Sequence, residues 1–513
     1  MDESFLFQTS EEQCETLVVA GRPLKDLVGE AQRLYLEDSR PWVIGYSGGK
    51  DSTAILQIIF LALLATPEER RHKPVFVVSS DTLVETPLVV NLVKGALLEL
   101  NQRALDLGIP LTAHQVVPKS NDGFWANLLG KGYPAPTQTF RWCTERMKIN
   151  PVSAFILEKV AEHGEVVVVL GSRRQESASR AQVIAKHKID GSSLARHTSL
   201  PNAYVYMPIE DWSADDVWEF LMSSPRPWGG TNRELLELYK GSNAGECPIV
   251  IDTSTPSCGN SRFGCWTCTV VTTDKAMESL VQHGEEWMRP LLEFRNLLAE
   301  TTVPANKKIY RNYKRRTGKI SYAKGDIQDD SDESATKKHI PGPYWLSYRK
   351  EWLTKLLQIE KSINEDGHAV ELITEDELHA IRAEWLIDPN EPDWADSLPK
   401  IYESVYGRSL EWRDNGLGSF AGEDAELLTE LGSRYGIDGR MLQKLMELEI
   451  SMDGLAKRQK MTARIETILK QDWETLEENL ARDHAAFDGG YSDEQVTLAD
   501  EMQAFERNVE ANL

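Results

Sequence analysis

The amino-acid sequence predicts an α/β protein: a parallel-sheet core, then a small subdomain built around four cysteines, then an α-helical C-terminal domain. Short apolar runs alternate with helical stretches between residues 41 and 240, which is typical of a parallel sheet with helical crossovers. Four of the six cysteines fall between residues 247 and 268. Apolar residues then recur at helical spacing through much of residues 341–513.

The predicted strands are short and apolar. The runs at 41–46, 74–80 and 165–170 predict buried strands, and 111–117 alternates less cleanly. Residues 53–65 predict a buried helix too short to span a membrane. We divide the chain into an N-terminal helical segment (1–40), a sheet domain (41–240), a cysteine subdomain (241–300), a basic then acidic linker (301–340) and an acidic helical domain (341–513).

Length and composition are those of a globular protein without a membrane segment. The 513 residues have room for about two to three domains. No apolar run reaches about 18 residues, and the acidic N-terminus lacks the basic start of a secretory signal, so we expect a cytoplasmic protein without membrane contact. The net charge of −23 is uneven: residues 341–513 carry 37 acidic and 18 basic side chains, and residues 1–340 carry 43 and 39. Acidity therefore does not exclude a nucleic acid substrate.

The most informative segment is a polar turn between the first strand of the core and the helix that follows. Its residues are Ser47, Gly48, Gly49, Lys50, Asp51 and Ser52. A strand that turns through glycines into a helix N-terminus directs several backbone N–H groups and the helix dipole at one point, which makes an anion site. Lys50 adds a positive charge, and Asp51 offers a carboxylate that could hold Mg²⁺ or orient a water.

This turn lacks the G-x-x-x-x-G-K-[ST] pattern of a Walker A loop. It resembles the pyrophosphate loop of the PP-loop superfamily, which includes N-type ATP pyrophosphatases, PAPS reductases, ATP sulfurylases and tRNA thiolation enzymes. The resemblance implies ATP as cofactor, cleavage between the α- and β-phosphates, and a PP-loop fold of the adenine nucleotide alpha hydrolase type.

Two further polar clusters follow predicted strands. Asp81, Thr82 and Glu85 lie where PAPS reductases carry a D-T-G-x-x-x-x-E-T segment, which implies contacts with nucleotide or substrate. A simple helix N-cap is the alternative. Because the carboxyl ends of parallel strands meet at one edge of a sheet, we expect these residues beside the pyrophosphate loop.

The second cluster resembles the G-x-R-x-x-E-S-x-x-R stretch of PAPS reductase-like proteins, where arginines bind an anionic substrate. Its matching residues are Gly171, Arg173, Glu176, Ser177 and Arg180, and Arg174 is a further arginine within it that we expect to act with Arg173. A nearby segment from Pro208 to Trp218 resembles the P-I-x-x-W-x-x-x-D-V-W signature of the same proteins. We expect a structural role there, with Ser213 as the N-cap of a helix.

Cys143 lies in a basic stretch with Arg141 and Lys148. Cations near a nucleotide neutralise phosphate or sulfate charge, and they also lower the pKa of a thiol. Cys143 could therefore carry persulfide sulfur, or it could merely pack as a small buried side chain.

The four clustered cysteines, Cys247, Cys258, Cys265 and Cys268, have C-x10-C-x6-C-x2-C spacing. Four thiolates suit a [4Fe–4S] cluster or structural Zn²⁺. Zinc would favour two close pairs, whereas this spacing has one, so we favour the iron–sulfur cluster. Its role could be sulfur relay, electron transfer or support of the fold.

Residues 307–324 are basic and interleaved with tyrosines, which suits either contact with nucleic acid phosphates or a solvated linker. Taken together, the parts resemble the DNA phosphorothioation sulfurtransferases of the PP-loop superfamily. That resemblance implies ATP, Mg²⁺ and a [4Fe–4S] cluster, DNA as substrate, a cysteine desulfurase as sulfur donor, and further phosphorothioation proteins as partners.

Three other functions compete with this one. A PAPS or APS reductase would carry an E-C-G-[LI]-H motif after the core, and residues 341–513 contain no cysteine. A tRNA thiolation enzyme would share the loop and the cluster but typically places its C-x2-C motifs elsewhere. A scaffold that binds ATP without turnover would use the acidic helical domain to dock its partners.

Overall fold

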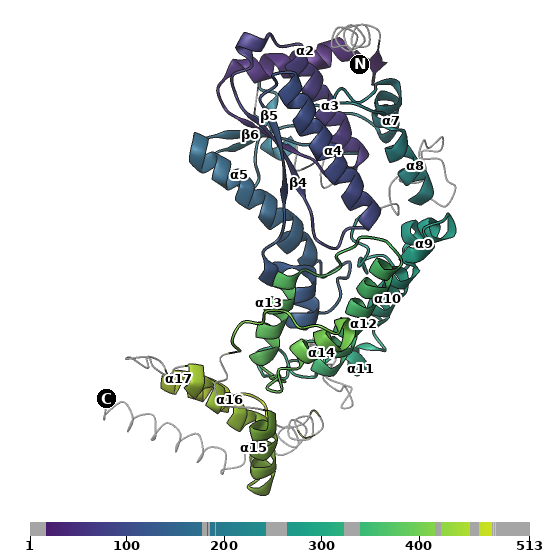
Figure 1. Cartoon of the computed structure of the whole chain (residues 1–513). Coiled ribbons are helices and arrows are strands. Elements are labelled where there is room, and N and C mark those ends of the chain that lie inside the picture. The colour runs from purple at the N-terminus through teal and green to yellow at the C-terminus, as the bar shows by residue number, and fades with distance from the viewer. Residues whose placement is uncertain are drawn as a thin grey trace, which may run out of the picture. The chain divides into compact units, whose positions relative to one another are not determined.

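The computed structural model describes residues 17–176, 182, 185–189, 191–242, 264–322, 339–415, 422–451, 461–473, 476 and 478 (Figure 1). The chain forms two compact units. The first comprises residues 1–306, 349–384 and 398–412, and the second comprises residues 307–348, 385–397 and 413–513.

A six-stranded, mostly parallel sheet lies at the centre of the first unit, which confirms the predicted fold class. Its strand order is β5-β4-β3-β6-β8-β7, and every neighbouring pair is parallel except β7 with β8. The strands are β3 (Trp42–Gly45), β4 (Val75–Ser80), β5 (Leu111–Val116), β6 (Val166–Val169), β7 (Leu194–Arg196) and β8 (Ala203–Tyr206). A separate two-stranded sheet pairs β1 (Val18–Val19) with β2 (Arg22–Pro23).

Helices cover both faces of the sheet, because side chains of successive strand residues point to opposite faces. Trp42 and Ile44 pack into a large core with α2 (Leu24–Glu37), α3 (Lys50–Leu64), α4 (Pro87–Asp106) and α7 (Ala214–Ser223). Val43, between them, packs instead with α5 (Asn150–His163) on the other face (Figure 1). The predicted N-cap is confirmed: Ser213 and Asp216 form a capping box at the start of α7.

The remaining helices confirm a helical C-terminal region. They are α8 (Arg233–Ser242), α9 (Lys275–Gln282), α10 (Arg289–Glu300), α11 (Lys307–Tyr310), α12 (Leu346–Glu365), α13 (Glu375–Leu386), α14 (Ser397–Tyr406), α15 (Gly422–Arg434), α16 (Gly439–Ser451) and α17 (Met461–Leu469). Among the described residues, none of the helices is long and apolar enough to cross a membrane.

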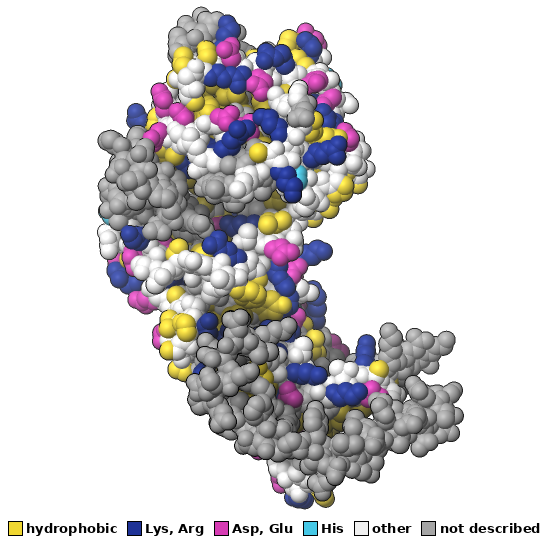
Figure 2. Space-filling model, turned by 180° about the vertical axis from the view of Figure 1, so that it is seen from behind, with side chains coloured by type: hydrophobic (Ala, Val, Ile, Leu, Met, Phe, Trp, Pro, Cys, Tyr) yellow, Lys and Arg dark blue, Asp and Glu magenta, His cyan; other side chains and the backbone are white. Residues whose placement is uncertain are grey.

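Two cations of the basic run 307–324 are used within the second unit: one hydrogen-bonds to backbone carbonyls and the other is buried. The Arg311 guanidinium donates to the carbonyl oxygens of Gly342 at 2.7 Å and Pro341 at 2.6 Å. Lys314 is 3% exposed, and burial lowers its pKa to about 8. Elsewhere on the surface, basic and acidic side chains are interspersed on the face shown in Figure 2. The run is therefore not a uniform phosphate-binding strip.

One buried glutamate of the first unit takes part in hydrogen bonds at two helical N-termini, through its backbone N–H and through its carboxylate. Glu377 is 1% exposed, in the first turn of α13, where its backbone N–H donates to the Thr374 hydroxyl at 3.2 Å. Its side chain accepts from the backbone N–H of Trp125 at 3.3 Å, at the start of the helical turn that includes Ala126–Gly130. Burial raises the pKa of Glu377 to about 7 despite these donors.

We expect Glu377→Gln to stabilise the protein at pH 8 and to change little near pH 4.5. The folded-state pKa lies above the ordinary value of 4.5, so this group costs stability as pH rises from 4.5 through 7. The full difference is ~3 kcal/mol in the free energy of unfolding. Urea denaturation followed by tryptophan fluorescence measures it.

Glu375→Gln is the matched control, since Glu375 lies in the same helical turn with its side chain 59% exposed. A stability gain from Glu377→Gln that does not depend on pH would contradict the assignment.

Candidate nucleotide and thiol site

The predicted pyrophosphate loop is a tight turn between β3 and α3. Gly48 has φ +72°, and a Cβ there would lie 2.6 Å from Val93, so the position requires glycine. The Ser52 hydroxyl donates to the carbonyl oxygen of Gly49 at 2.9 Å and accepts from the backbone N–H of Ser47 at 3.2 Å. The loop is thereby closed on itself, and the N-terminus of α3 faces the pocket.

Asp51 lies between two buried cations. Lys50 Nζ is 3.0 Å from one carboxylate oxygen, and Arg173 Nε is 2.7 Å from the other. Lys50 and Arg173 are each 4% exposed, and Arg173 also donates to the carbonyl oxygen of Trp212 at 3.3 Å. The three side chains carry a net charge of +1, which suits an anionic ligand.

The turn after β6 approaches the pyrophosphate loop very closely. A Cβ on Gly171 would lie 2.9 Å from the backbone carbon and oxygen of Asp51. Only glycine permits this approach, and it brings Arg173 to Asp51. Arg174 points elsewhere, because its guanidinium pairs with Glu210 at 3.0 Å and Asp211 at 3.4 Å, before α7.

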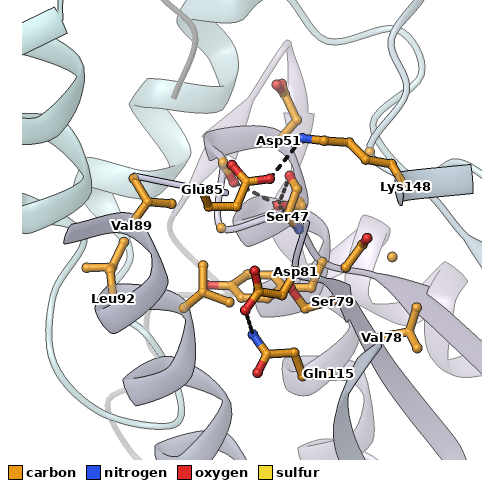
Figure 3. Close-up of a pocket in the computed structure, with 18 of the residues that line it drawn as sticks. Ser47, Asp51, Val78, Ser79, Asp81, Glu85, Val89, Leu92, Gln115 and Lys148 are labelled. Atoms are coloured by element: carbon orange, nitrogen blue, oxygen red, sulfur yellow. Dashed lines mark hydrogen bonds and ion pairs between the residues drawn. The ribbon is translucent and has the colours of Figure 1, made fainter. Parts of the chain in front are cut away.

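The end of β4 contributes a second polar wall. Asp81 is 6% exposed; one of its oxygens accepts from the backbone N–H of Leu83 at 2.8 Å, and the other accepts from Gln115 Nε2 at 3.2 Å (Figure 3). Burial raises the pKa of Asp81. Leu83 has φ +62°, an uncommon conformation for a side chain of this kind, so the turn between Asp81 and Glu85 is constrained.

Glu85 connects the pocket with the thiols. Its Oε1 accepts from the Thr82 hydroxyl at 3.0 Å and lies 3.1 Å from Lys148 Nζ (Figure 3). The same oxygen is 3.8 Å from the Cys265 sulfur, and the Thr82 hydroxyl is 3.3 Å from that sulfur. One carboxylate therefore contacts a cation that lines the pocket and a cysteine beside it.

The chain around Cys265 is fastened to the turn after β4. Glu85 and Cys265 form an antiparallel β-bridge, and the Trp266 N–H donates to the carbonyl oxygen of Val84 at 3.0 Å. The Cys268 N–H donates to the carbonyl oxygen of Cys265 at 3.0 Å, which closes the C-x2-C turn. Burial, then the Glu85 carboxylate, raise the pKa of the Cys265 thiol.

Cys143 belongs to the same neighbourhood. Burial raises the pKa of its thiol, and the charge of Cys268 raises it further. Lys148 lowers the pKa of the Cys143 thiol, as predicted, but by less than burial raises it. Cys247, Cys258 and Arg180 lie outside the described residues. Within the part of the chain that the structure describes, no group of three or more His, Cys, Asp or Glu side chains is arranged to hold a metal ion.

These elements enclose a pocket of about 560 Å³, within the usual range for small-molecule sites. Besides the predicted residues, Gln115, Val93 and Tyr239 line it. The Lys50 N–H donates to the Tyr239 hydroxyl at 3.4 Å, and Lys50 Nζ lies 5.7 Å from the centre of that ring. Gln115 lies within β5, the least regular of the predicted strands, and Tyr239 on α8 has no sequence signal of its own.

Comparison with known families identifies the class of this domain. Residues 41–271 match the family model of the phosphoadenosine phosphosulfate (PAPS) reductase domain. This range contains the sheet, the pyrophosphate loop, the Gly171–Arg173 turn and the C-x2-C turn. The chain therefore contains a PAPS reductase-like domain with the PP-loop fold.

Individual relatives are distant. An uncharacterised protein of Methanocaldococcus jannaschii is 24% identical over 273 residues, which cover 53% of this chain but only 45% of that protein. Similar solved structures include the PAPS reductase of Candida auris (15% identity, TM-score 0.27, 47% of this chain and 94% of that chain). They also include the U34-tRNA thiolase NcsA of Methanococcus maripaludis with its [4Fe–4S] cluster (13% identity, TM-score 0.27, 54% and 79%).

We expect Gly171→Ala to destabilise the protein by ~1–3 kcal/mol, because the added methyl group collides with the backbone at Asp51. Gly95→Ala on α4 is the matched control: a Cβ there meets nothing within 4 Å, and alanine gains up to ~1 kcal/mol in a helix. Chemical denaturation compares the two. Equal effects of both substitutions would show that the Gly171 turn does not press on the loop.

Proposed function

We propose that the protein is an ATP pyrophosphatase and sulfurtransferase that adenylylates a backbone phosphate of DNA so that sulfur replaces a non-bridging oxygen. The observation that carries this proposal is the contact of Glu85 with both Lys148, on the wall of the pocket, and Cys265, in the thiol site. This contact supports a reaction in which the phosphate is activated and the sulfur is delivered at neighbouring positions.

The reaction follows from the chemistry of the phosphodiester. Its oxygen is a poor leaving group, so sulfur cannot displace it directly. Attack of that oxygen on the ATP α-phosphorus forms a new P–O bond, breaks the α–β anhydride bond and releases pyrophosphate. A sulfide or persulfide sulfur then attacks the DNA phosphorus, and AMP leaves with the original oxygen. If the donor is a persulfide, a second thiol cleaves the S–S bond and a disulfide remains.

Residues of the loop are suited to the first step. Backbone N–H groups at the start of α3 and the Lys50 ammonium would stabilise negative charge on the departing pyrophosphate. Arg173 holds Asp51 in place at 2.7 Å. Asp51 would hold Mg²⁺, which supplies further charge neutralisation when bound. This scheme needs little acid–base chemistry.

The thiol residues fit an iron–sulfur cluster in part. Cys265 and Cys268 lie in a closed C-x2-C turn, and thiolates are the usual ligands of such clusters. We propose Cys247 and Cys258 as the other two ligands. A bound [4Fe–4S] cluster would supply iron with an affinity for sulfur beside the pocket. Cys143 remains the proposed persulfide carrier.

The protein that best matches this proposal is DndC of bacterial DNA phosphorothioation, by the order of its motifs. Its partners would be DNA, a cysteine desulfurase as sulfur donor, and the other Dnd proteins, in the cytoplasm. A PAPS or APS reductase, a tRNA thiolation enzyme and a scaffold without turnover remain the alternatives, since each would share the nucleotide pocket.

We expect ATP and DNA to yield pyrophosphate, and Lys50→Ala and Asp51→Ala to lower its release by about 100-fold or more. The first substitution removes a positive charge that stabilises the departing pyrophosphate, and the second removes the proposed Mg²⁺ ligand. Lys355→Ala is the control, since Lys355 pairs on the surface with Glu351 in α12. ATP binding without pyrophosphate release would indicate a scaffold.

DNA sulfur in a gene-deleted cell tests the substrate. If the protein restores DNA sulfur there, its substrate is DNA and not tRNA or sulfate. Normal DNA sulfur with Cys143→Ser would exclude Cys143 as the carrier.

We expect anaerobically purified protein to be brown and to contain iron and acid-labile sulfide. Cys265→Ser should lose the iron because it removes a thiolate ligand, whereas Cys14→Ser should keep it. Elemental analysis and visible absorbance measure both. A colourless protein with stoichiometric zinc would contradict the iron–sulfur assignment.

A further inference from the structure

The segment between β5 and α5, residues 117–150, differs in charge from the rest of the chain. It carries five basic and two acidic side chains, although the whole chain has a net charge of −23. We call it the basic segment. Its Lys148 lines the nucleotide pocket, so it borders the opening of the site.

The basic segment also exposes large apolar side chains. Val117 is 51% exposed, Phe140 46% and Ile149 53%. Single exposed apolar residues are common, but exposed apolar side chains beside cations are the composition of an interaction surface, and this one segment has three of them with five cations. Arg141, next to Phe140, is exposed as well.

The loop that presents Phe140 is held firmly. Thr137 and Phe140 exchange backbone hydrogen bonds of 3.2 Å in both directions. The Trp142 indole donates to the carbonyl oxygen of Pro134 at 3.0 Å and stacks on Phe124 with ring centres 5.5 Å apart. The Thr269 hydroxyl donates to the carbonyl oxygen of Pro136 at 2.6 Å. A loop whose backbone is held in this way loses little backbone entropy when a flat partner covers the ring that it presents.

Two of the other cations are used within the protein. Arg146 donates to Asn127 at 2.8 Å, lies 3.3 Å from Asp122 and covers the Tyr133 ring at 5.1 Å. Lys131 donates to the carbonyl oxygen of Asn121 at 2.5 Å. Among the exposed cations of this segment, Arg141 is the one next in sequence to the exposed Phe140 ring.

We propose that the basic segment holds a DNA strand at the opening of the pocket, with Phe140 stacked on an unpaired base and Arg141 bound to a backbone phosphate. Aromatic rings beside cations are the usual means of holding single strands without reading their sequence. This inference rests on the proposed function, because it concerns the substrate of that reaction. A phosphate of the held strand would then lie near Lys148 and the nucleotide.

Fluorescence anisotropy of a labelled oligothymidylate, with the full-length protein and no ATP, tests this inference. Phe140→Ala should weaken binding about 5- to 100-fold and leave the salt dependence unchanged, since stacking carries no charge. Arg141→Ala should reduce the slope of log K against log salt concentration by about 0.7, the value for one phosphate contact on a single strand. Phe140→Trp should restore the affinity, because indole also stacks.

Two exposed residues elsewhere in the first unit serve as controls. Leu98→Ala removes a side chain on α4 that is 70% exposed, and Arg196→Ala removes an exposed cation on β7, at the sheet edge opposite β5. Neither should change the affinity or the salt slope. Both act as tests of non-specific surface effects.

The measurements distinguish three occupants of this surface: single-stranded DNA, a protein partner and RNA. Wild-type affinity in Phe140→Ala and Arg141→Ala would overturn the inference, and loss of DNA sulfur in cells with unchanged oligonucleotide binding would assign the surface to a protein partner instead. Tighter binding of oligouridylate than of oligothymidylate would replace DNA by RNA. Because no ATP is present, strand binding that depends on Phe140 would stand even if pyrophosphate release failed.

Discussion

The placement of Asp51 between Lys50 and Arg173 is the constraint on which the site depends. The two cations come from different strand ends, β3 and β6, and they meet only because Gly171 has no side chain. A carboxylate held partly out of water is costly without partners, and two buried cations offset that cost while leaving one positive charge in excess. The loop, the β6 turn and the start of α7 are therefore positioned as one assembly, since Arg173 also donates to Trp212.

Glu85 plays the corresponding role on the other side of the pocket. It collects donors from three separate parts of the chain, Thr82, Lys148 and Cys265, at one oxygen. The β-bridge between Glu85 and Cys265 fixes the backbone as well as the side chains. A ligand that attracts Lys148 would therefore alter the charge beside the Cys265 sulfur, so occupancy of the pocket and the state of the thiols are physically linked.

Local patterns were enough to predict much of this arrangement. Apolar runs gave the strands β3, β4 and β6, and the strand–turn–helix context of Ser47 to Ser52 gave the loop, because these depend on neighbours in sequence. Gln115, Tyr239 and the contact of Glu377 with Trp125 were missed because each depends on a partner more than 30 residues away. Arg174 lies within the segment that resembles the family motif, yet its charge pairs with Glu210. At Cys143, burial raises the pKa of the thiol by more than Lys148 lowers it. Burial depends on the folded chain and not on neighbours in sequence.

The contacts of the Phe124–Gly130 turn bear on how this protein is made. The Trp125 indole donates to the carbonyl oxygen of Leu372 at 2.6 Å, and Arg349 donates to that of Gly130 at 2.6 Å. Both partners lie more than 200 residues further along the chain, within the same unit. During synthesis the N-terminal sheet emerges from the ribosome long before these partners do. Until then, the Trp125 indole N–H and the Gly130 carbonyl can hydrogen-bond only to water. A shortened chain that ends before residue 349 would keep the pocket residues and yet lack both of these partners of the turn.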